Sequence, residues 1–165
     1  GVLKNVKCLS QRVLKDPSLR VIVVCGKNKA LYEKLTPLAI EHSGSFRLFG
    51  YVEELHELLK LSNCLITKPG GISITEAAAL HLPLILYKPV PGQEAENAKH
   101  FQAHGAAIIA ESADEIAEHV QNLFNNEQLV RRMKSGLQHI HQSRSSSIIA
   151  EHALVEIEHL SEITQ

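Results

Sequence analysis

Two stretches of the chain combine glycines with hydroxyl, amide and carboxylate side chains in the order of a ligand-binding loop. They are residues 67–76, TKPGGISITE, and residues 87–97, YKPVPGQEAEN. Each follows an apolar run that suits a strand, and each opens a helical pattern. In open parallel sheets, loops at the carboxyl ends of the strands form the ligand crevice. We therefore expect the first stretch to hold a diphosphate and a ribose, and the second to reach a sugar attached to them.

Gly70 and Gly71 stand where the first stretch turns from strand to helix. A glycine lets the backbone adopt a positive φ and approach a ligand closely. The helix that follows would present free amides and the positive end of its dipole to an anion. A tight turn that binds nothing would use the same two residues, so the pair alone leaves both interpretations open.

Ser73, Thr75 and Glu76 could complete this site. The two hydroxyls would reach the phosphates, and the Glu76 carboxylate would accept hydrogen bonds from the vicinal ribose hydroxyls. The structural alternative is a capping box formed by Ser73 and Glu76, with Thr75 an ordinary helix residue. Local spacing does not choose between them.

In the second stretch, Gln93, Glu94 and Asn97 follow Pro91 and Gly92. Amide and carboxylate groups in a row supply donors and acceptors together, which suits the hydroxyls of a hexose. The alternative is a Pro-Gly turn followed by an acidic first helical turn, which the helix dipole favours.

Other chemistries find little support in the sequence. The chain has neither the P-loop motif nor G-x-G-x-x-G, which disfavours a P-loop nucleotidase and a nicotinamide or flavin site. His100 and His104 have the spacing of helical metal ligands, but no further ligand spacing completes a site, so a solvated helix face is the better interpretation. No Ser-His-Asp or Cys-His arrangement can be argued. A nucleotide bound at the Gly-Gly helix start remains the favoured interpretation.

The composition indicates one ordinary globular domain with a core. The chain has 165 residues, 44% of them hydrophobic and 21% charged, with a net charge of -1. This balance argues against nucleic acid as the main partner and supplies no polybasic membrane anchor within the segment. No signal peptide and no apolar run of about 18 residues is present. Because the chain lacks an initiating Met, we expect a fragment.

The odd number of cysteines argues against a disulfide framework. Cys8, Cys25 and Cys64 are interpreted as buried thiols of a cytosolic protein, and two of them lie inside apolar runs.

Alternating apolar runs and helical stripes predict an α/β domain with a parallel sheet flanked by helices. Strands are expected near residues 20–25, 46–49, 63–66, 83–86 and 106–109. Helices are expected near residues 3–13, 31–38, 53–60, 94–101, 112–123, 130–140 and 150–157, the last after a polar break at 143–147. A helix of small residues is expected to open at Gly70 and Gly71, and Ser112 with Glu115 predicts a capping box at the start of the helix at 112–123. A doubly wound domain usually opens with a strand before its first helix. That strand would lie upstream of Gly1 and be central, so its absence leaves the stability of the sheet unexplained.

The two loops closely resemble those of a known family. TKPGGISITEA at 67–77, and LYKPVPGQE at 86–94 with Glu96 and Asn97 after it, are similar to the processive diacylglycerol β-glucosyltransferases of glycosyltransferase family 28. Plant monogalactosyldiacylglycerol synthases and the bacterial lipid II GlcNAc transferase are more distant relatives. The likeness also covers GVLKNV at 1–6, VVCGKN at 23–28, GYVE at 50–53 and RMK at 132–134.

The resemblance implies that residues 1–165 form the C-terminal, donor-binding half of a GT-B fold, which places its active site between two Rossmann-like domains. The implied donor-binding residues are Gly26, Asn28, Tyr51, Val52, Gly70, Gly71, Ser73, Thr75, Glu76, Gln93, Glu94 and Asn97. Those of the first stretch would hold the diphosphate, with Glu76 at the ribose, and those of the second the hexose. Tyr51 and Val52 would hold uracil through backbone groups, and residues 26–28 would line the same crevice.

By the same resemblance, the full enzyme is inverting and needs no metal or other cofactor, because amides and a helix dipole stabilise the leaving UDP. Its donor would be UDP-glucose and its acceptor diacylglycerol or glucosyl-diacylglycerol. The acceptor site, the catalytic base and the membrane-binding surface would belong to an N-terminal domain absent from this chain. We therefore expect no catalytic residue here, weak UDP binding, and a full enzyme that is cytoplasmic and peripheral on the inner face of the membrane.

Three other functions are compatible with parts of the pattern. They are a UDP-GlcNAc transferase acting on a lipid-linked peptidoglycan precursor, a non-catalytic nucleotide-sugar-sensing module, and a nucleotide-sugar epimerase on the same fold. The run at 88–94 favours the glycolipid enzyme. An epimerase would need acid and base side chains in its cleft, and no convincing set is found.

Overall fold

The structure, a computed structural model, describes residues 5–141. In chain order its elements are α1 (Val6–Val13), β1 (Val21–Val24), α2 (Lys29–Glu41), β2 (Phe46–Phe49), α3 (Leu55–Lys60), β3 (Leu65–Thr67), α4 (Gly71–Ala79), β4 (Leu84–Tyr87), α5 (Gln93–Ala103), β5 (Ala107–Ala110), α6 (Ala113–Asn125) and α7 (Glu127–Ile140). The α/β class and all five predicted strands are confirmed. The helix expected at 150–157 and the polar break before it lie outside the described residues.

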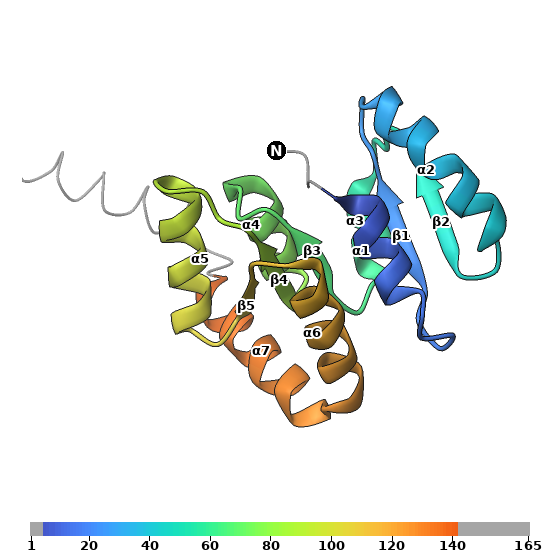
Figure 1. The fold of residues 1–165 in the computed structure, drawn as a ribbon. Coiled ribbons are helices and arrows are strands. Elements are labelled where there is room, and N and C mark those ends of the chain that lie inside the picture. The colour runs from blue at the N-terminus through green and yellow to red at the C-terminus, as the bar shows by residue number, and fades with distance from the viewer. Residues whose placement is uncertain (1–4, 142–165) are drawn as a thin grey trace, which may run out of the picture.

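The strands form two parallel sheets (Figure 1), where one sheet was expected. β1 pairs with β2, and β3, β4 and β5 pair in that order. Between β1 and β3 lies a cavity of about 510 Å³, lined by every residue of both strands. All pairings are parallel as predicted, but the prediction of a single sheet is wrong, because nothing in the described chain bridges β1 and β3.

The gap has the position of the expected upstream strand. α1 leads into β1. In a parallel sheet, the helix before a strand normally connects that strand to a neighbouring parallel strand earlier in the chain. The free edge of β1 faces this gap, since its other edge is occupied by β2. A strand between β1 and β3 would join the two halves into one sheet.

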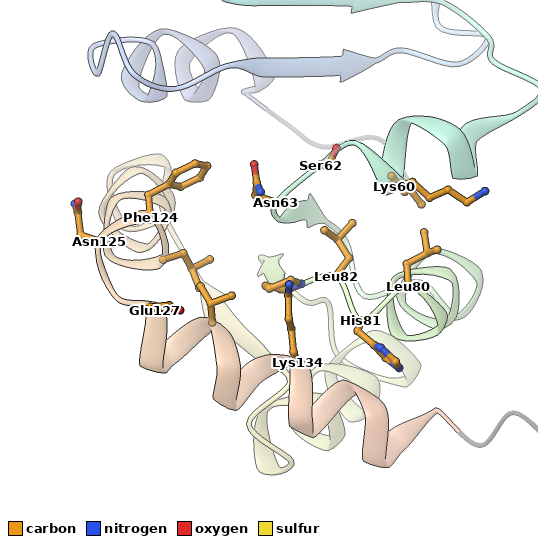
Figure 2. A pocket seen from close by; sticks show the side chains of 14 residues that line it. Lys60, Ser62, Asn63, Leu80, His81, Leu82, Phe124, Asn125, Glu127 and Lys134 are labelled. Carbon is orange, nitrogen blue, oxygen red and sulfur yellow. The ribbon is translucent and has the colours of Figure 1, made fainter.

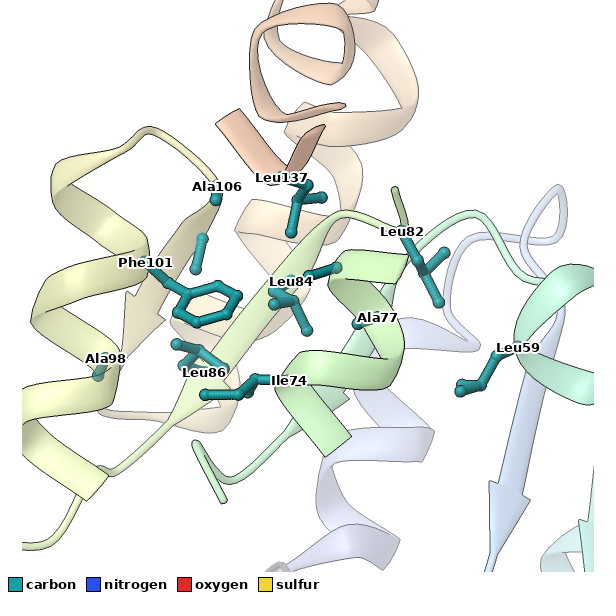
Figure 3. Close-up of a cluster of buried hydrophobic side chains, with 12 residues drawn as sticks. Leu59, Ile74, Ala77, Leu82, Leu84, Leu86, Ala98, Phe101, Ala106 and Leu137 are labelled. Carbon is teal, nitrogen blue, oxygen red and sulfur yellow. The ribbon is translucent and has the colours of Figure 1, made fainter. Parts of the chain in front are cut away.

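The larger half packs side chains against both faces of β4. Leu84 and Leu86 join a cluster with Phe101 and Leu137 under α4, α5 and α7 (Figure 3). Ile85 and Tyr87 point to the other face, where α1 and α6 cover them. All four residues of β4 are buried. This explains why β4 is a continuous apolar run, since a strand covered on both faces has no solvent side.

The smaller half has a thinner core. Its cluster contains only Val6, Cys25 and Leu35 as buried members, and Ile22 of β1 is 38% exposed. α1 connects the halves, because Val6 belongs to this cluster while Leu9 packs in the core beneath α6.

Two further expectations concern side chains away from the sheet. The capping box at the start of α6 is confirmed in part: the Ser112 hydroxyl accepts from the Glu115 amide at 3.1 Å, while Glu115 reaches the Glu111 amide. The prediction of buried thiols is wrong for Cys8, which is exposed on α1, and right for Cys25. Burial raises the pKa of Cys64 to about 11, so this thiol stays neutral and is no nucleophile.

Candidate functional site

The two predicted loops leave the same edge of the larger sheet side by side. β3 ends at Thr67, which lies opposite Leu86 near the end of β4. α4 begins four residues after Thr67, and α5 begins at Gln93, after the Pro-Gly turn. The predicted crevice at the carboxyl ends of parallel strands is therefore confirmed as a layout.

α4 starts without any side-chain cap. Its N-cap is Gly70, which has φ -73° and ψ 138°, and no side chain in the described part of the chain caps the helix. The capping-box alternative for Ser73 and Glu76 is wrong, because the helix begins at Gly71 and Ser73 already lies within it. The first amides of α4 and its dipole are consequently open to an anion.

Neither glycine at this start is required by the fold itself. Only Gly26, Gly92 and Gly105 have a positive φ among the described glycines, so the expectation of a positive φ at 70–71 is wrong. A Cβ added at Gly70 or Gly71 would meet no atom within 4 Å. Gly70 is the N-cap, where glycine is among the preferred residues. Close approach by a ligand would account for the second glycine, Gly71.

Ser73 and Glu76 line the cavity between the half-sheets, together with Gly26 from the end of β1. Both side chains are half-buried. Within residues 5–141 the Glu76 carboxylate has no hydrogen-bond or ion-pair partner, so both oxygens can accept. The structure thus brings these three predicted residues to one cavity.

Thr75 is less available than expected. Its hydroxyl donates to the Gly71 carbonyl at 2.7 Å, and its side chain is on the exposed side of α4. Threonine side chains inside helices commonly make this bond to the carbonyl four residues earlier. The Thr75 hydroxyl would have to give it up in order to donate to a phosphate.

The remaining predicted residues of the smaller half lie around the end of β1 and β2. Asn28 caps α2, because its Oδ1 accepts from the Leu31 amide at 3.0 Å. Tyr51 is 65% exposed, and the Lys27 ammonium lies 5.6 Å from its ring centroid. Val52 is half-buried, and neither it nor Tyr51 lines the cavity that holds Glu76.

In the second loop, two predicted sugar ligands are engaged with the protein. Glu94 Oε2 accepts from the Val90 amide at 3.1 Å and from the Lys68 ammonium at 3.4 Å. The Val90 amide and, to a smaller extent, Lys68 hold the pKa of Glu94 below its ordinary value. Asn97 donates to the Pro69 carbonyl at 3.0 Å, while Gln93 is exposed.

Sequence reasoning gave Lys68 no role, yet it joins both loops. Its ammonium donates to the Lys88 carbonyl at 2.9 Å as well as to Glu94. Its partners are 20 and 26 residues away in the chain, so no local pattern signals the contact.

A second cavity, of about 490 Å³, opens at the opposite edge of the larger sheet (Figure 2). Lys60, His81 and Lys134 stand around an apolar wall that includes Leu82. None of the predicted donor-binding residues lines it, although it adjoins the first cavity at Leu59, Ser62, Asn63 and Phe124.

Metal-ligand geometry is absent from the described part of the chain. Within residues 5–141, no three His, Cys, Asp or Glu side chains are placed to share a metal ion. His104 Nδ1 lies 2.8 Å from the His100 carbonyl oxygen, so the His104 ring contacts the backbone of its own helix. In the same residues, no helix combines the length and the apolar character needed to cross a membrane.

The parallel strands, the uncapped glycine helix start and the crevice at the carboxyl edge are those of a Rossmann-like domain, and the family match identifies it as one half of a GT-B glycosyltransferase. The chain belongs to the family described as "Glycosyl transferases group 1", whose model matches residues 1–138. The narrower assignment to family 28 stays a prediction.

The resemblance read from the loops is confirmed by curated relatives. The chain is 49% identical over 158 residues to the processive diacylglycerol beta-glucosyltransferase of Bacillus subtilis. This match covers 96% of this chain and 41% of the relative. It is 48% identical over 151 residues to the enzyme of the same name from Bacillus pumilus, covering 92% of this chain and 39% of the relative. The chain thus spans about two fifths of the length of these relatives.

Solved structures share the fold at low identity. MurG of Acinetobacter baumannii matches with a TM-score of 0.70 and 19% identity over 90% of this chain and 46% of its own. Staphylococcus aureus MnaA, solved with UDP, matches with a TM-score of 0.74 and 15% identity over 96% of this chain and 44% of its own. These matches establish the shared fold.

Proposed function

We propose that residues 1–165 are the C-terminal donor-binding domain of an inverting hexosyltransferase that moves glucose from UDP-glucose to diacylglycerol. The observation that carries the proposal is the uncapped start of α4 at Gly70 and Gly71, with Glu76 in the adjoining cavity and without a partner among residues 5–141. The 49% identity to a relative named as a diacylglycerol glucosyltransferase supports the acceptor class.

In this proposal the diphosphate lies against the first amides of α4. The amides donate to the phosphate oxygens, and the helix dipole favours the charge that develops on UDP as the sugar leaves. The Ser73 hydroxyl adds a donor, and the two oxygens of Glu76 accept from the ribose hydroxyls. No metal or other cofactor is needed for this stabilisation.

The rest of the reaction belongs to parts of the full-length enzyme beyond this chain. Diacylglycerol or glucosyl-diacylglycerol would bind to an N-terminal domain that also supplies the catalytic base. That domain would hold the enzyme on the inner face of the cell membrane, since the acceptor is a lipid. The 165-residue chain alone then binds donor and transfers nothing.

Calorimetric titration of the chain with UDP tests the proposal, with NAD as a control ligand. We expect UDP to bind and Glu76→Ala to weaken it about tenfold, equal to about 1.4 kcal/mol, because a charge-assisted hydrogen bond is lost. Glu118→Ala changes an exposed carboxylate on α6 and should leave UDP affinity unchanged.

Equal affinity of the wild type and Glu76→Ala would contradict the ribose role. If UDP fails to bind, the same titration on the full-length enzyme decides between a wrong assignment and an incomplete crevice. Absence of binding there too would overturn the proposed function.

A further inference from the structure

Three hydrogen bonds tie the first loop to the second. The Lys68 ammonium donates to the Lys88 carbonyl at 2.9 Å and to Glu94 Oε2 at 3.4 Å. Asn97 donates to the Pro69 carbonyl at 3.0 Å. These contacts within the protein hold the loops that follow β3 and β4 in one relative position.

The contact with Lys88 holds an unusual backbone conformation. Lys88 has φ 45°, in the left-handed region that residues with a side chain rarely adopt. Such a conformation persists only where its surroundings fix it. Here the Lys88 amide donates to the Ala110 carbonyl at 3.0 Å, and its own carbonyl accepts from Lys68. Lys68 thereby helps to fix the direction in which the second loop leaves β4.

Glu94 is held through one of its two oxygens. Oε2 accepts from both the Val90 amide and Lys68, whereas Oε1 has no hydrogen-bond partner within residues 5–141. The side chains of Lys68 and Glu94 are 18% and 25% exposed, so the ion pair is largely shielded from water. A carboxylate anchored in this way offers its second oxygen at a fixed place.

We propose that Lys68 is a positioning residue that fixes the Glu94 carboxylate for the hexose of a nucleotide-sugar donor. This inference rests on the proposed function. Lys68 acts on the sugar through Glu94 and the second loop, while the nucleotide is held by α4. Loss of the Lys68 ammonium then weakens binding of the sugar part and spares binding of UDP.

A merely structural contact would behave differently. If Lys68 only stabilised the fold around the crevice, its removal would weaken UDP and UDP-glucose by the same factor. The ratio of the two dissociation constants in one variant therefore separates positioning from general stabilisation. This ratio is insensitive to the fraction of folded protein, because it cancels from both constants.

The experiment titrates UDP and UDP-glucose into the wild-type chain and four variants. Lys68→Met removes the charge, Lys68→Gln keeps a donor without charge, and Lys68→Arg restores a cation. Lys99→Met is the matched control, because Lys99 pairs with Glu96 on the solvent side of α5, where both side chains are more than 70% exposed.

For Lys68→Met and Lys68→Gln we expect UDP-glucose affinity to fall about tenfold while UDP affinity stays within about twofold. Lys68→Arg should recover part of the loss, and Lys99→Met should match the wild type. An unchanged ratio in Lys68→Met, or in Lys68→Gln if the former does not fold, overturns the positioning role while the proposed function stands. If neither the wild-type chain nor the full-length enzyme binds UDP, the proposed function is overturned, and this inference falls with it.

Discussion

At the scale of a single residue, substitution of Gly71 tests a role in binding separately from a role in folding. As the first residue of α4 it has open space where a Cβ would lie. Gly71→Ala should therefore leave the thermal midpoint unchanged or raise it, since Ala favours a helix over Gly by up to about 1 kcal/mol. The same methyl group would stand where the diphosphate approaches the amides, so UDP affinity should fall about tenfold.

Calorimetry and thermal unfolding of the same samples check this prediction. Gly44→Ala is the control, because a Cβ there also meets nothing within 4 Å and the residue lies in the turn before β2. It should leave UDP affinity unchanged. Unaltered UDP affinity in Gly71→Ala would show that no diphosphate lies at the start of α4.

The sequence predicted those parts of the site whose residues lie close together in the chain. Gly70, Gly71, Ser73 and Glu76 stand at the N-cap and in the first two turns of α4, so their joint placement followed once the helix start was recognised. The role of Lys68 could not be predicted in this way, because its partners reach it only when β3 and β4 pair.

At the scale of elements, Gly136 fixes how closely α7 approaches the turn between α5 and β5. A Cβ added there would overlap the carbonyl oxygen of His104 and lie 3.1 Å from the Ala106 amide nitrogen. Both neighbours are backbone atoms, so neither can rotate away. Gly136→Ala should lower the free energy of unfolding by about 2–3 kcal/mol, because overpacking forces α7 away from the turn.

Urea denaturation measures this effect, with Ser135→Ala on the exposed side of the same helix as control. Ser135→Ala should change stability by less than about 0.5 kcal/mol. A Gly136→Ala variant as stable as the wild type would mean that α7 does not pack against the turn in this way.

Elements themselves were predictable where burial is complete or periodic. The run at 84–87 is apolar throughout because both faces of β4 are covered. α6 was located from Ser112 and its apolar stripe, and its start is confirmed. The start of α4 was expected at Gly70 and Gly71 and is confirmed there, while the Ser-x-x-Glu alternative, which would have begun the helix later, is wrong.

For the whole molecule, the split sheet could not be read from the pattern of strands. Each strand of the chain was found, but pairing depends on what lies between β1 and β3, and the described chain places nothing there. The two half-sheets meet through α1 and the chain from β2 to β3, while the cavity that separates them also reaches Glu76. A strand that filled the gap would therefore also complete the crevice in the same event.

The amide groups that face the gap make this event measurable. The amides of Val21 and Cys25 donate toward β2, so in a regular parallel strand those of Ile22 and Val24 face the gap. The Leu65 amide donates to the Pro83 carbonyl, and the Ile66 amide accordingly faces the gap from the other side. These three amides should exchange hydrogen rapidly in the 165-residue chain.

Extending the chain upstream with the native sequence of the full-length protein should add a parallel strand in the gap. We expect the amides of Ile22, Val24 and Ile66 to become protected at least about a hundredfold, as each gains a strand partner. The Val23 amide, which faces β2, should be protected in both forms. UDP affinity should rise in the extended form, because one strand fixes β1 and α4 relative to each other. The gap would not be a strand site if all three amides were already protected in the shorter chain, or if they were protected in neither the shorter nor the extended form.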